Sequence, residues 1–418
     1  MTPSGDRRPV AGAMFFLAFV SVLIPMMATD AMGVNMDVIP SIRLQEEWQS
    51  NVFDASTDEV SSFGTSLTPG LALKFTSVDN VMLQISGNYE KVWYHNSEAK
   101  DADTDTWFFR VDSTGGWKLT PTFSMLPSVY YVNTVDSSRR TQLVPSGDPV
   151  LPPVTITNYG NTKTKEFGGA MNFSYLATPN LTLGVNGNYS EQRFSEGTDN
   201  TTGSGLTNAK TTGGNASVSY LFSPRTSLGI LVAGNHQTYE NNPDSNTLSG
   251  GILFGYQFSP VLRLEGAFGM SYIRQSEAPG IPKQRESSPS GLINFNYASE
   301  GFTAGVFGSA VYSGGSGFGE ATRQYTGGLA FSDQFAMQWS WSLSGAYQVS
   351  RSVFETAESV DLTTIYGTAG LSYKPWEWGS LDLTGNLNRQ TSHGQVGDTL
   401  NSYSALLGFT IAKSYKIY

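Results

Sequence analysis

Residues 335–349 read FAMQWSWSLSGAYQV, and this stretch decides the fold. Every odd position is apolar or Gly, including Phe335, Trp339 and Trp341, while every even position is small or polar. A period of two places one set of side chains on one face of a β-strand and the other set on the opposite face. The stretch is also longer than the roughly 9–11 residues that a tilted strand needs to cross a bilayer. It therefore predicts a membrane-spanning strand with a lipid-facing side and a polar side.

The same alternation recurs along the chain, in residues 181–189, 262–272 and 381–388 among others. Charged residues are only 14% of the 418, against roughly 25% in an average soluble protein. Aromatic residues reach 12%, and 45 residues are Gly. A helical membrane protein would need several apolar runs of about 20 residues, and the chain has at most one. The pattern indicates an all-β fold.

Composition also excludes several classes of function. The chain has no Cys, which rules out disulfide scaffolds, thiolate metal sites and cysteine nucleophiles. A net charge of -10 argues against a nucleic-acid partner, because binding depends on Lys and Arg that neutralise phosphates. Three His residues offer little material for a metal centre.

The connections between strands alternate in length. Tyr175-Leu-Ala-Thr-Pro179 and Tyr220-Leu-Phe-Ser-Pro224 are nearly the same phrase, in which an aromatic residue precedes a tight turn. Such turns are expected near residues 78, 121, 179, 224, 260, 300, 333 and 376, and longer polar loops, such as 136–161 and 195–208, separate them. Short turns at one end and long loops at the other are typical of outer-membrane barrels. We predict a transmembrane antiparallel up-and-down β-barrel of the outer membrane, with about 18 strands (16–20). Residues 38–53 and 105–119 are two of these expected strands.

The N-terminus predicts export from the cytoplasm. Arg7 and Arg8 precede an apolar segment, and small residues follow it. This order is typical of a secretory signal peptide, which we assign to residues 1–31 with cleavage between 28 and 33; the alternative is an uncleaved anchor helix. Residues 32–418 then form a single outer-membrane barrel, with both ends and the short turns in the periplasm.

Parity along the strands predicts which residues line the lumen. Residues opposite the lipid-facing positions are mostly Ser, Thr, Asn, Gln and Gly, with few charges of mixed sign. The candidate lumen-lining residues are Arg43, Glu47, Gln84, Asn88, Arg263, Glu265, Gln338, Asp382, Asn386 and Asn388. Such a lining suits neutral or weakly charged hydrophilic solutes, sugars included. The alternative is that Arg43, Glu47, Arg263 and Glu265 only pair with lumen neighbours.

No catalytic, cofactor-binding or metal-binding set is expected. His95, His236 and His393 fall at strand ends and are interpreted as surface residues. The Asp101-Ala-Asp103-Thr-Asp105 run lacks the Gly and Glu of a calcium loop, so a solvated acidic loop is the better interpretation. The glycine-rich residues 314–319 lack the Lys-Ser/Thr of a phosphate loop. We therefore predict that the protein is not an enzyme and has no cofactor.

The opening of the mature chain carries a family resemblance. Its motif runs from Pro40 through Trp48 to Asn51-Val52-Phe53, and with the repeated hairpins and the closing Leu407-Gly-Phe409-Thr-Ile411 it resembles β-barrel porin family 2. Members are outer-membrane β-barrels, often of exopolysaccharide export systems. The closing strand has a good outward face up to Ile411, so residues 412–418 are either a short tail or a degenerate insertion signal.

Three function classes remain open at this stage. The resemblance implies a passive conduit for export of a secreted polysaccharide, with a periplasmic polysaccharide export protein as partner, docked on the short-turn rim where Trp376 and Trp378 are either anchors or membrane-interface aromatics. Barrel size alone supports a general diffusion or solute-uptake porin for small hydrophilic solutes. The third class is the barrel sheath of a porin–cytochrome electron conduit. In each case outer-membrane lipid surrounds the protein.

Overall fold

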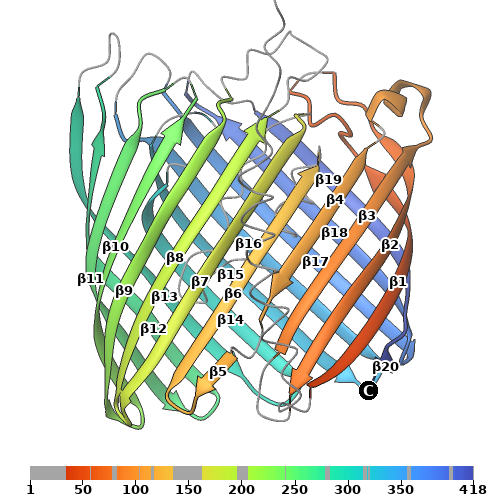
Figure 1. Cartoon of the computed structure of the whole chain (residues 1–418). Coiled ribbons are helices and arrows are strands. Elements are labelled where there is room, and N and C mark those ends of the chain that lie inside the picture. Colours follow the sequence, from red (N-terminus) through yellow and green to blue (C-terminus); the bar gives the residue numbers. More distant parts are fainter. Residues whose placement is uncertain are drawn as a thin grey trace, which may run out of the picture.

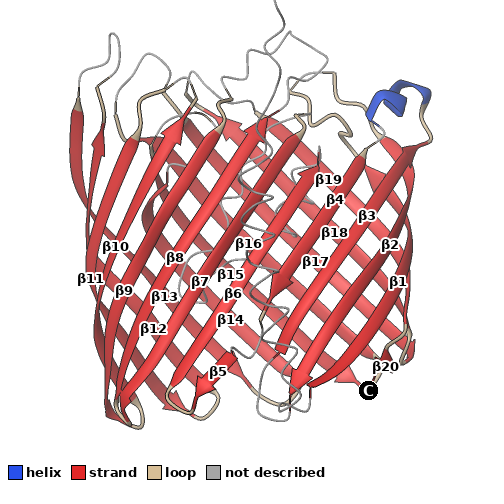
Figure 2. Cartoon of the chain, viewed as in Figure 1, coloured by secondary structure: helices blue, strands red, loops and turns tan. Residues whose placement is uncertain are grey.

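The computed structural model describes residues 34–417, apart from residues 57, 78–81, 103, 114–116, 135–161, 195–205, 241, 278–282, 314–317, 319–320, 355–358 and 395–398. The predicted signal segment and most of the long loops lie outside the described residues. The described part is built almost entirely of tilted antiparallel strands (Figure 2). Its one helix, the short 3₁₀ segment η1 (Ser97–Ala102), lies beyond the strands at one end. No helix in the described ranges is long and apolar enough to span a bilayer.

The strands follow one another around the barrel. The first ten are β1 (Val34–Gln49), β2 (Ser62–Ser77), β3 (Met82–Tyr94), β4 (Asp105–Asp112), β5 (Trp117–Thr120), β6 (Phe123–Thr134), β7 (Thr164–Thr178), β8 (Leu181–Phe194), β9 (Ala209–Ser223) and β10 (Thr226–Tyr239). The others are β11 (Ser245–Ser259), β12 (Leu262–Gln275), β13 (Gln284–Ala298), β14 (Phe302–Ser313), β15 (Thr322–Ala336), β16 (Trp339–Ser352), β17 (Asp361–Trp376), β18 (Gly379–Ser392), β19 (Leu400–Ala412) and β20 (Tyr415–Ile417).

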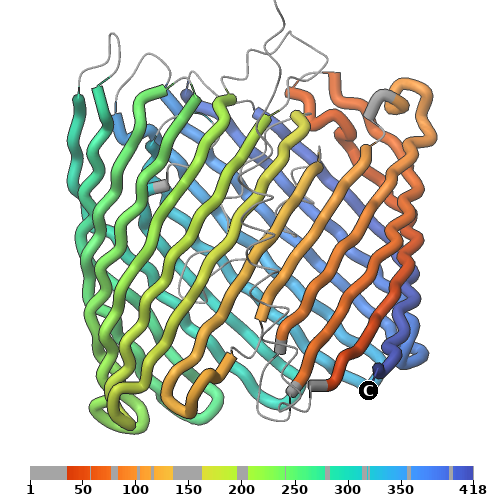
Figure 3. The backbone as a smooth tube through the Cα atoms, in the orientation of Figure 1, coloured from red at the N-terminus to blue at the C-terminus, as the bar shows by residue number. Residues whose placement is uncertain are grey.

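The sheet closes on itself between its first and last strands. β1 pairs antiparallel with β19, with Ile42 opposite Ile411 and Leu44 opposite Phe409, and the ends of the chain's colour gradient meet there in Figure 3. Among the described residues, β4 and β5 share one position beside β6, and β19 and β20 share one position beside β1. The twenty strands thus fill eighteen positions, as predicted. Closure removes the free edges that would leave backbone groups unpaired in hydrocarbon.

Two expected boundaries are wrong in detail. Residues 105–119 were expected to form one strand, but β4 ends at Asp112 and β5 begins only at Trp117. The opening strand ends at Gln49, so the Asn51-Val-Phe53 motif lies in the following loop rather than in the strand. Asn51 is fully buried there and binds the Ala55 carbonyl (2.8 Å) and the Asn401 carbonyl (3.1 Å) through Nδ2.

The repeated turn phrase has a local physical cause. The Thr178 hydroxyl accepts a hydrogen bond from the Leu181 amide (3.1 Å), and the Ser223 hydroxyl accepts one from the Arg225 amide (3.2 Å). The strand register shifts just before the turn, as at Leu176/Thr178. This irregularity lets the end of the strand, which carries the aromatic residue, bend into a tight turn. A hydroxyl residue before Pro thus caps the turn.

Short turns and long connections lie at opposite ends of the barrel (Figure 1). The turns at 121, 179, 224, 260 and 300 occur where predicted. The turn expected near residue 333 lies about four residues later. β15 continues to Ala336, and Met337-Gln338 forms the turn. The C-terminus lies at the short-turn end, labelled C in Figure 1, and β1 begins at the same end. By the rule for outer-membrane barrels, this end faces the periplasm.

The chain does not leave the barrel after Ile411 as a loose tail. β20 continues the pairing with β1, with Tyr415 opposite Val38 and Ile417 opposite Met36. These two residues have the same parity as Phe409 and Ile411 and are exposed. The outward apolar alternation therefore runs through Ile417, and only Lys413 interrupts it, with its ammonium 5.4 Å from the centre of the Tyr415 ring.

Candidate functional site

The outer face of the barrel is apolar and exposed. On β18, Leu381 and Leu383 point outward, and Leu383 lies in register between Leu371 of β17 and Leu407 of β19. Large apolar side chains with a third or more of their surface exposed recur on almost every strand, among them Ile252, Phe268 and Leu383. A soluble protein does not expose so large a continuous apolar surface, whereas lipid tails cover it without cost.

The chain is an outer-membrane β-barrel. Aromatic residues border its apolar band, as membrane interfaces favour. At the short-turn end, the Trp376 and Trp378 rings stack with centroids 5.0 Å apart, and Trp339 stacks on Tyr373 at 4.5 Å. Trp339 and Trp341 share the outward face predicted for them, because they pair in register with Tyr373 and Leu371.

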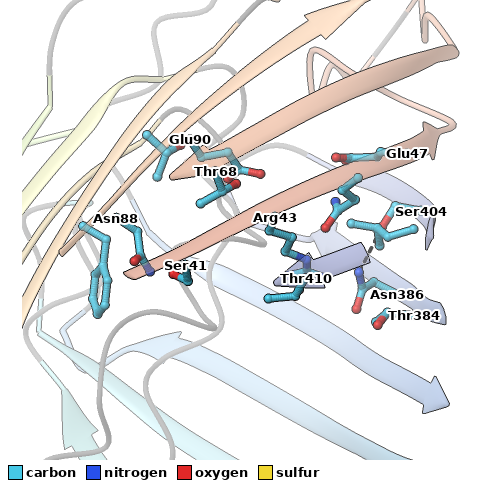
Figure 4. Close-up of a pocket in the computed structure, with 14 residues that line it drawn as sticks. Ser41, Arg43, Glu47, Thr68, Asn88, Glu90, Thr384, Asn386, Ser404 and Thr410 are labelled. Atoms are coloured by element: carbon cyan, nitrogen blue, oxygen red, sulfur yellow. Dashed lines mark hydrogen bonds between the residues drawn. The ribbon is translucent and has the colours of Figure 1, made fainter. Parts of the chain in front are cut away.

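The candidate site is a cavity in the lumen, beside the seam where β1 meets β19. It has a volume of about 340 Å³, within the range of roughly 300–1,000 Å³ that ligand pockets occupy. β1 supplies Arg43 and Glu47, β3 supplies Asn88, and β18 supplies Asn386 (Figure 4). Four of the ten predicted lumen residues therefore line one cavity, although they are far apart in the sequence.

The charged groups of this cavity are of mixed sign. Glu47 is buried and Arg43 is half-buried on the same face of β1, and Glu90 of β3 also lines the cavity. Gly408 of β19 leaves room for the Arg43 side chain, because a Cβ at Gly408 would lie 2.9 Å from Arg43 Nε. That Nε has no hydrogen-bond partner among the described residues. Because this Nε is also buried, it is not open to a solute in this arrangement.

Uncharged hydrogen bonds tie neighbouring strands together along the wall. Asn386 accepts from Thr368 Oγ1 (3.1 Å) and donates to Ser404 Oγ (3.1 Å), which links β17, β18 and β19. On the other side, Ser271 links Ser249 (2.6 Å) and Ser290 (2.7 Å) across β11, β12 and β13. Asn186 of β8 donates a hydrogen bond to Asn172 of β7. The wall is a network of hydroxyls and amides.

The remaining predicted residues lie outside the cavity. Arg263 and Glu265 form an ion pair with each other on β12, as the alternative interpretation expected for them. Asp382 accepts from Ser372 Oγ (2.7 Å) and Ser380 Oγ (3.0 Å) near the short-turn end.

Three more of the predicted residues occupy separate places. Gln84 pairs in register with Lys74 and Asp112, away from the cavity. Asn388 is buried on β18, and its Oδ1 has no partner among the described residues. Gln338 does not lie on a strand as expected. It lies in the Met337-Gln338 turn, because β16 begins only at Trp339.

Sequence reasoning missed several cavity residues. Glu90, Ser404 and Thr410 line the cavity with the predicted set. Glu90 has the inward parity of Asn88, two positions earlier, so the alternation of β3 could have found it. Phe108 and Leu406 also line the cavity, and no polar pattern marks them.

No group of three or more His, Asp or Glu that could hold a metal occurs within the described ranges. Asp105, from the predicted acidic loop, instead accepts from Tyr89 (2.8 Å) and pairs with Lys91 (3.1 Å). Asp103 and most of the glycine-rich 314–319 segment are outside the described residues. His95 lies 3.9 Å from Glu46, and His236 contacts Asn246, both on the outer face near the loop end.

Comparison with known proteins adds a likeness of overall shape. No family model and no curated protein matches the chain, so the match to β-barrel porin family 2 itself stays a resemblance. The outer membrane protein OpdK of Pseudomonas aeruginosa is 11% identical, with 91% of this chain and 99% of that chain covered and a TM-score of 0.44. OccAB4 of Acinetobacter baumannii is 10% identical, with 90% and 98% covered and a TM-score of 0.44. The FrpB iron transporter of Neisseria meningitidis is 10% identical, with 86% and 63% covered and a TM-score of 0.45.

Proposed function

We propose that the protein is a passive outer-membrane conduit for uptake of small hydrophilic solutes. The observation that carries the proposal is the cavity beside the barrel seam, where Arg43, Glu47 and two Asn side chains face one space of about 340 Å³. Amides, hydroxyls and charges of both signs offer donors and acceptors to a polyhydroxylated or zwitterionic solute. The wall network of neutral hydrogen bonds gives such a solute successive partners along the lumen.

The location of the barrel in the outer membrane determines the direction and the driving force of solute transport. The described strands hold no nucleotide-binding motif, and the outer membrane has no ATP, so a solute moves down its own gradient. Arg43 and Glu47 lie four residues apart on one strand face, so their fields largely offset each other for a solute of either charge. The geometry favours selection by size and hydrogen bonding over selection by charge.

The two other interpretations have weaker support. Polysaccharide export rested on the family resemblance, which no family model supports. It also required a periplasmic partner on the short-turn rim, where the exposed Trp376 and Trp378 rings stack on each other in the manner of interface aromatics. A cytochrome sheath has no specific observation in its favour.

A deletion strain separates these classes. We expect slower growth when a small hydrophilic nutrient is limiting, restored by the wild-type gene, with unchanged surface polysaccharide and unchanged extracellular electron transfer. Loss of surface polysaccharide with normal solute uptake would refute the proposal and favour export. Loss of electron transfer alone would favour the sheath.

A further inference from the structure

The outward face of the barrel carries a belt of charge at its loop end. Strand register places nine basic side chains and four acidic ones on this face within the described residues. The basic ones are Lys91, Lys165, Arg193, Lys210, Arg274, Arg285, Arg323, Arg351 and Arg389, and the acidic ones are Glu46, Asp105, Glu191 and Asp361. The belt is thus strongly basic on a chain whose net charge is -10.

Much of this charge is neutralised locally. Lys91 pairs with Asp105 (3.1 Å), Arg193 with Glu191 (2.6 Å) and Arg351 with Asp361 (3.5 Å). Arg274 and Arg285 differ from these, because neither has a carboxylate within ion-pair distance among the described residues. They are the last outward residue of β12 and the first outward residue of β13, and both are exposed.

Arg274 and Arg285 are direct partners in the β12–β13 ladder. Directly opposite residues on one face of an antiparallel pair have Cβ atoms about 4.5–5.5 Å apart, and like charges there repel. Lys283, two positions before Arg285, adds a third cation, and its pKa is lowered chiefly by the Arg274 charge. Glu277 opposes this effect only in part. Arg274, Arg285 and Lys283 therefore bring three positive charges close together at the ends of β12 and β13.

The position of Arg274 along β12 shows at which depth of the membrane the cluster lies. Phe268, Met270 and Tyr272 precede Arg274 on the same outward face of β12, and all three are exposed. They belong to the lipid-covered band, so Arg274 stands one outward position beyond an interface Tyr. That is the depth of lipid head groups. On the neighbouring strand β11, Asn246 lies opposite Arg274 and adds a neutral amide.

We propose that Arg274, Arg285 and Lys283 form a binding site for the phosphate groups of an anionic lipid in the leaflet at the loop end. A phosphate between the two guanidiniums would replace their repulsion with charge-assisted hydrogen bonds, because guanidinium matches phosphate geometry in a bidentate fashion. This site lies on the outside of the barrel, so it is independent of the proposed transport function. It would anchor the loop end of the β12–β13 hairpin in the head-group layer.

The test is binding of lipid A, a diphosphorylated glycolipid, to the purified full chain in neutral detergent, followed by native mass spectrometry. We expect the Arg274→Gln/Arg285→Gln double variant to bind roughly thirtyfold more weakly, from about tenfold per 1.4 kcal/mol and about 1 kcal/mol for each basic residue near a charged lipid surface. The matched control is Arg225→Gln, an exposed Arg in a short turn at the other end, which should bind as the wild type does. Equal binding by the double variant and the wild type would overturn the proposal.

Two further arms identify the ligand. Phosphatidylcholine, which has no net charge, should bind the wild type no better than the double variant. Inorganic phosphate should not displace lipid A at equal concentration, and displacement would show a free-anion site instead of a lipid site. If the double variant fails to fold, the wild type still tests the idea, because binding must weaken steeply with added salt. Salt-independent binding would contradict it.

Discussion

Replacing Leu383 with Arg tests the assignment of faces at the middle of β18. Leu383 is 51% exposed, and it lies between Leu371 and Leu407 in a row of outward apolar side chains. An Arg there would place a guanidinium in hydrocarbon, which costs about 2–4 kcal/mol near the bilayer midplane. At about 1.4 kcal/mol per factor of ten, the ratio of folded to unfolded barrel should fall roughly 30- to 700-fold.

The adjacent residue supplies the matched control. Thr384 lies one position further on the same strand and lines the lumen cavity. Thr384→Arg carries the same charge into water rather than lipid, so the unfolding free energy should change little. Denaturant unfolding of both variants in lipid vesicles measures the difference. Equal losses, or a larger loss for Thr384→Arg, would show that the inside and outside faces of β18 are reversed.

Three further predictions concern other parts of the barrel. Asn51→Ala removes hydrogen bonds to the Ala55 and Asn401 carbonyls from a fully buried site, so denaturant unfolding should show a loss of about 1–3 kcal/mol; a loss no greater than that of the exposed Ser97→Ala would contradict the structural role of Asn51. The chain lacks Cys, so single Cys variants report topology: an impermeant maleimide should label Ser97→Cys but not Asn180→Cys on intact cells, and the reverse pattern would invert the barrel. Arg43→Gln leaves Glu47 and Glu90 as the charges of the cavity, so reversal potentials in planar bilayers should shift toward cation selectivity, whereas Arg225→Gln should leave them unchanged.

Much of the barrel could be predicted from the sequence because bilayer crossing imposes the same rule on every strand. Lipid on one side and water on the other force a period of two, and short turns need hydroxyl and Pro residues such as Thr178 and Pro179. Strand number, closure and most turns follow from these two local signals.

The errors arise where local signals are weak. The Phe331-Ser-Asp-Gln334 segment resembles the other turn phrases, yet strand pairing continues to Ala336. The actual turn contains Met337, an apolar residue that is 95% exposed at the membrane edge. An apolar side chain is unremarkable beside lipid, so a turn there leaves no composition signal.

The candidate site depends on distant neighbours that no local pattern contains. Parity placed Arg43 and Asn386 on the lumen side, but only closure of β1 on β19 brings them to one cavity. Likewise, Arg274 and Arg285 face each other only through the register of β12 and β13. The sequence order alone gives no reason to pair them.

The most direct test of the central claim is solute flux through the purified barrel in liposomes. Swelling rates with neutral sugars of increasing size should exceed those of protein-free liposomes and fall steadily as the sugars grow. Arg43→Gln should change these neutral-solute rates less than it changes ion selectivity, because hydrogen bonding and size govern passage. Sugar flux no greater than in protein-free liposomes would contradict the account of this lumen as an uptake conduit.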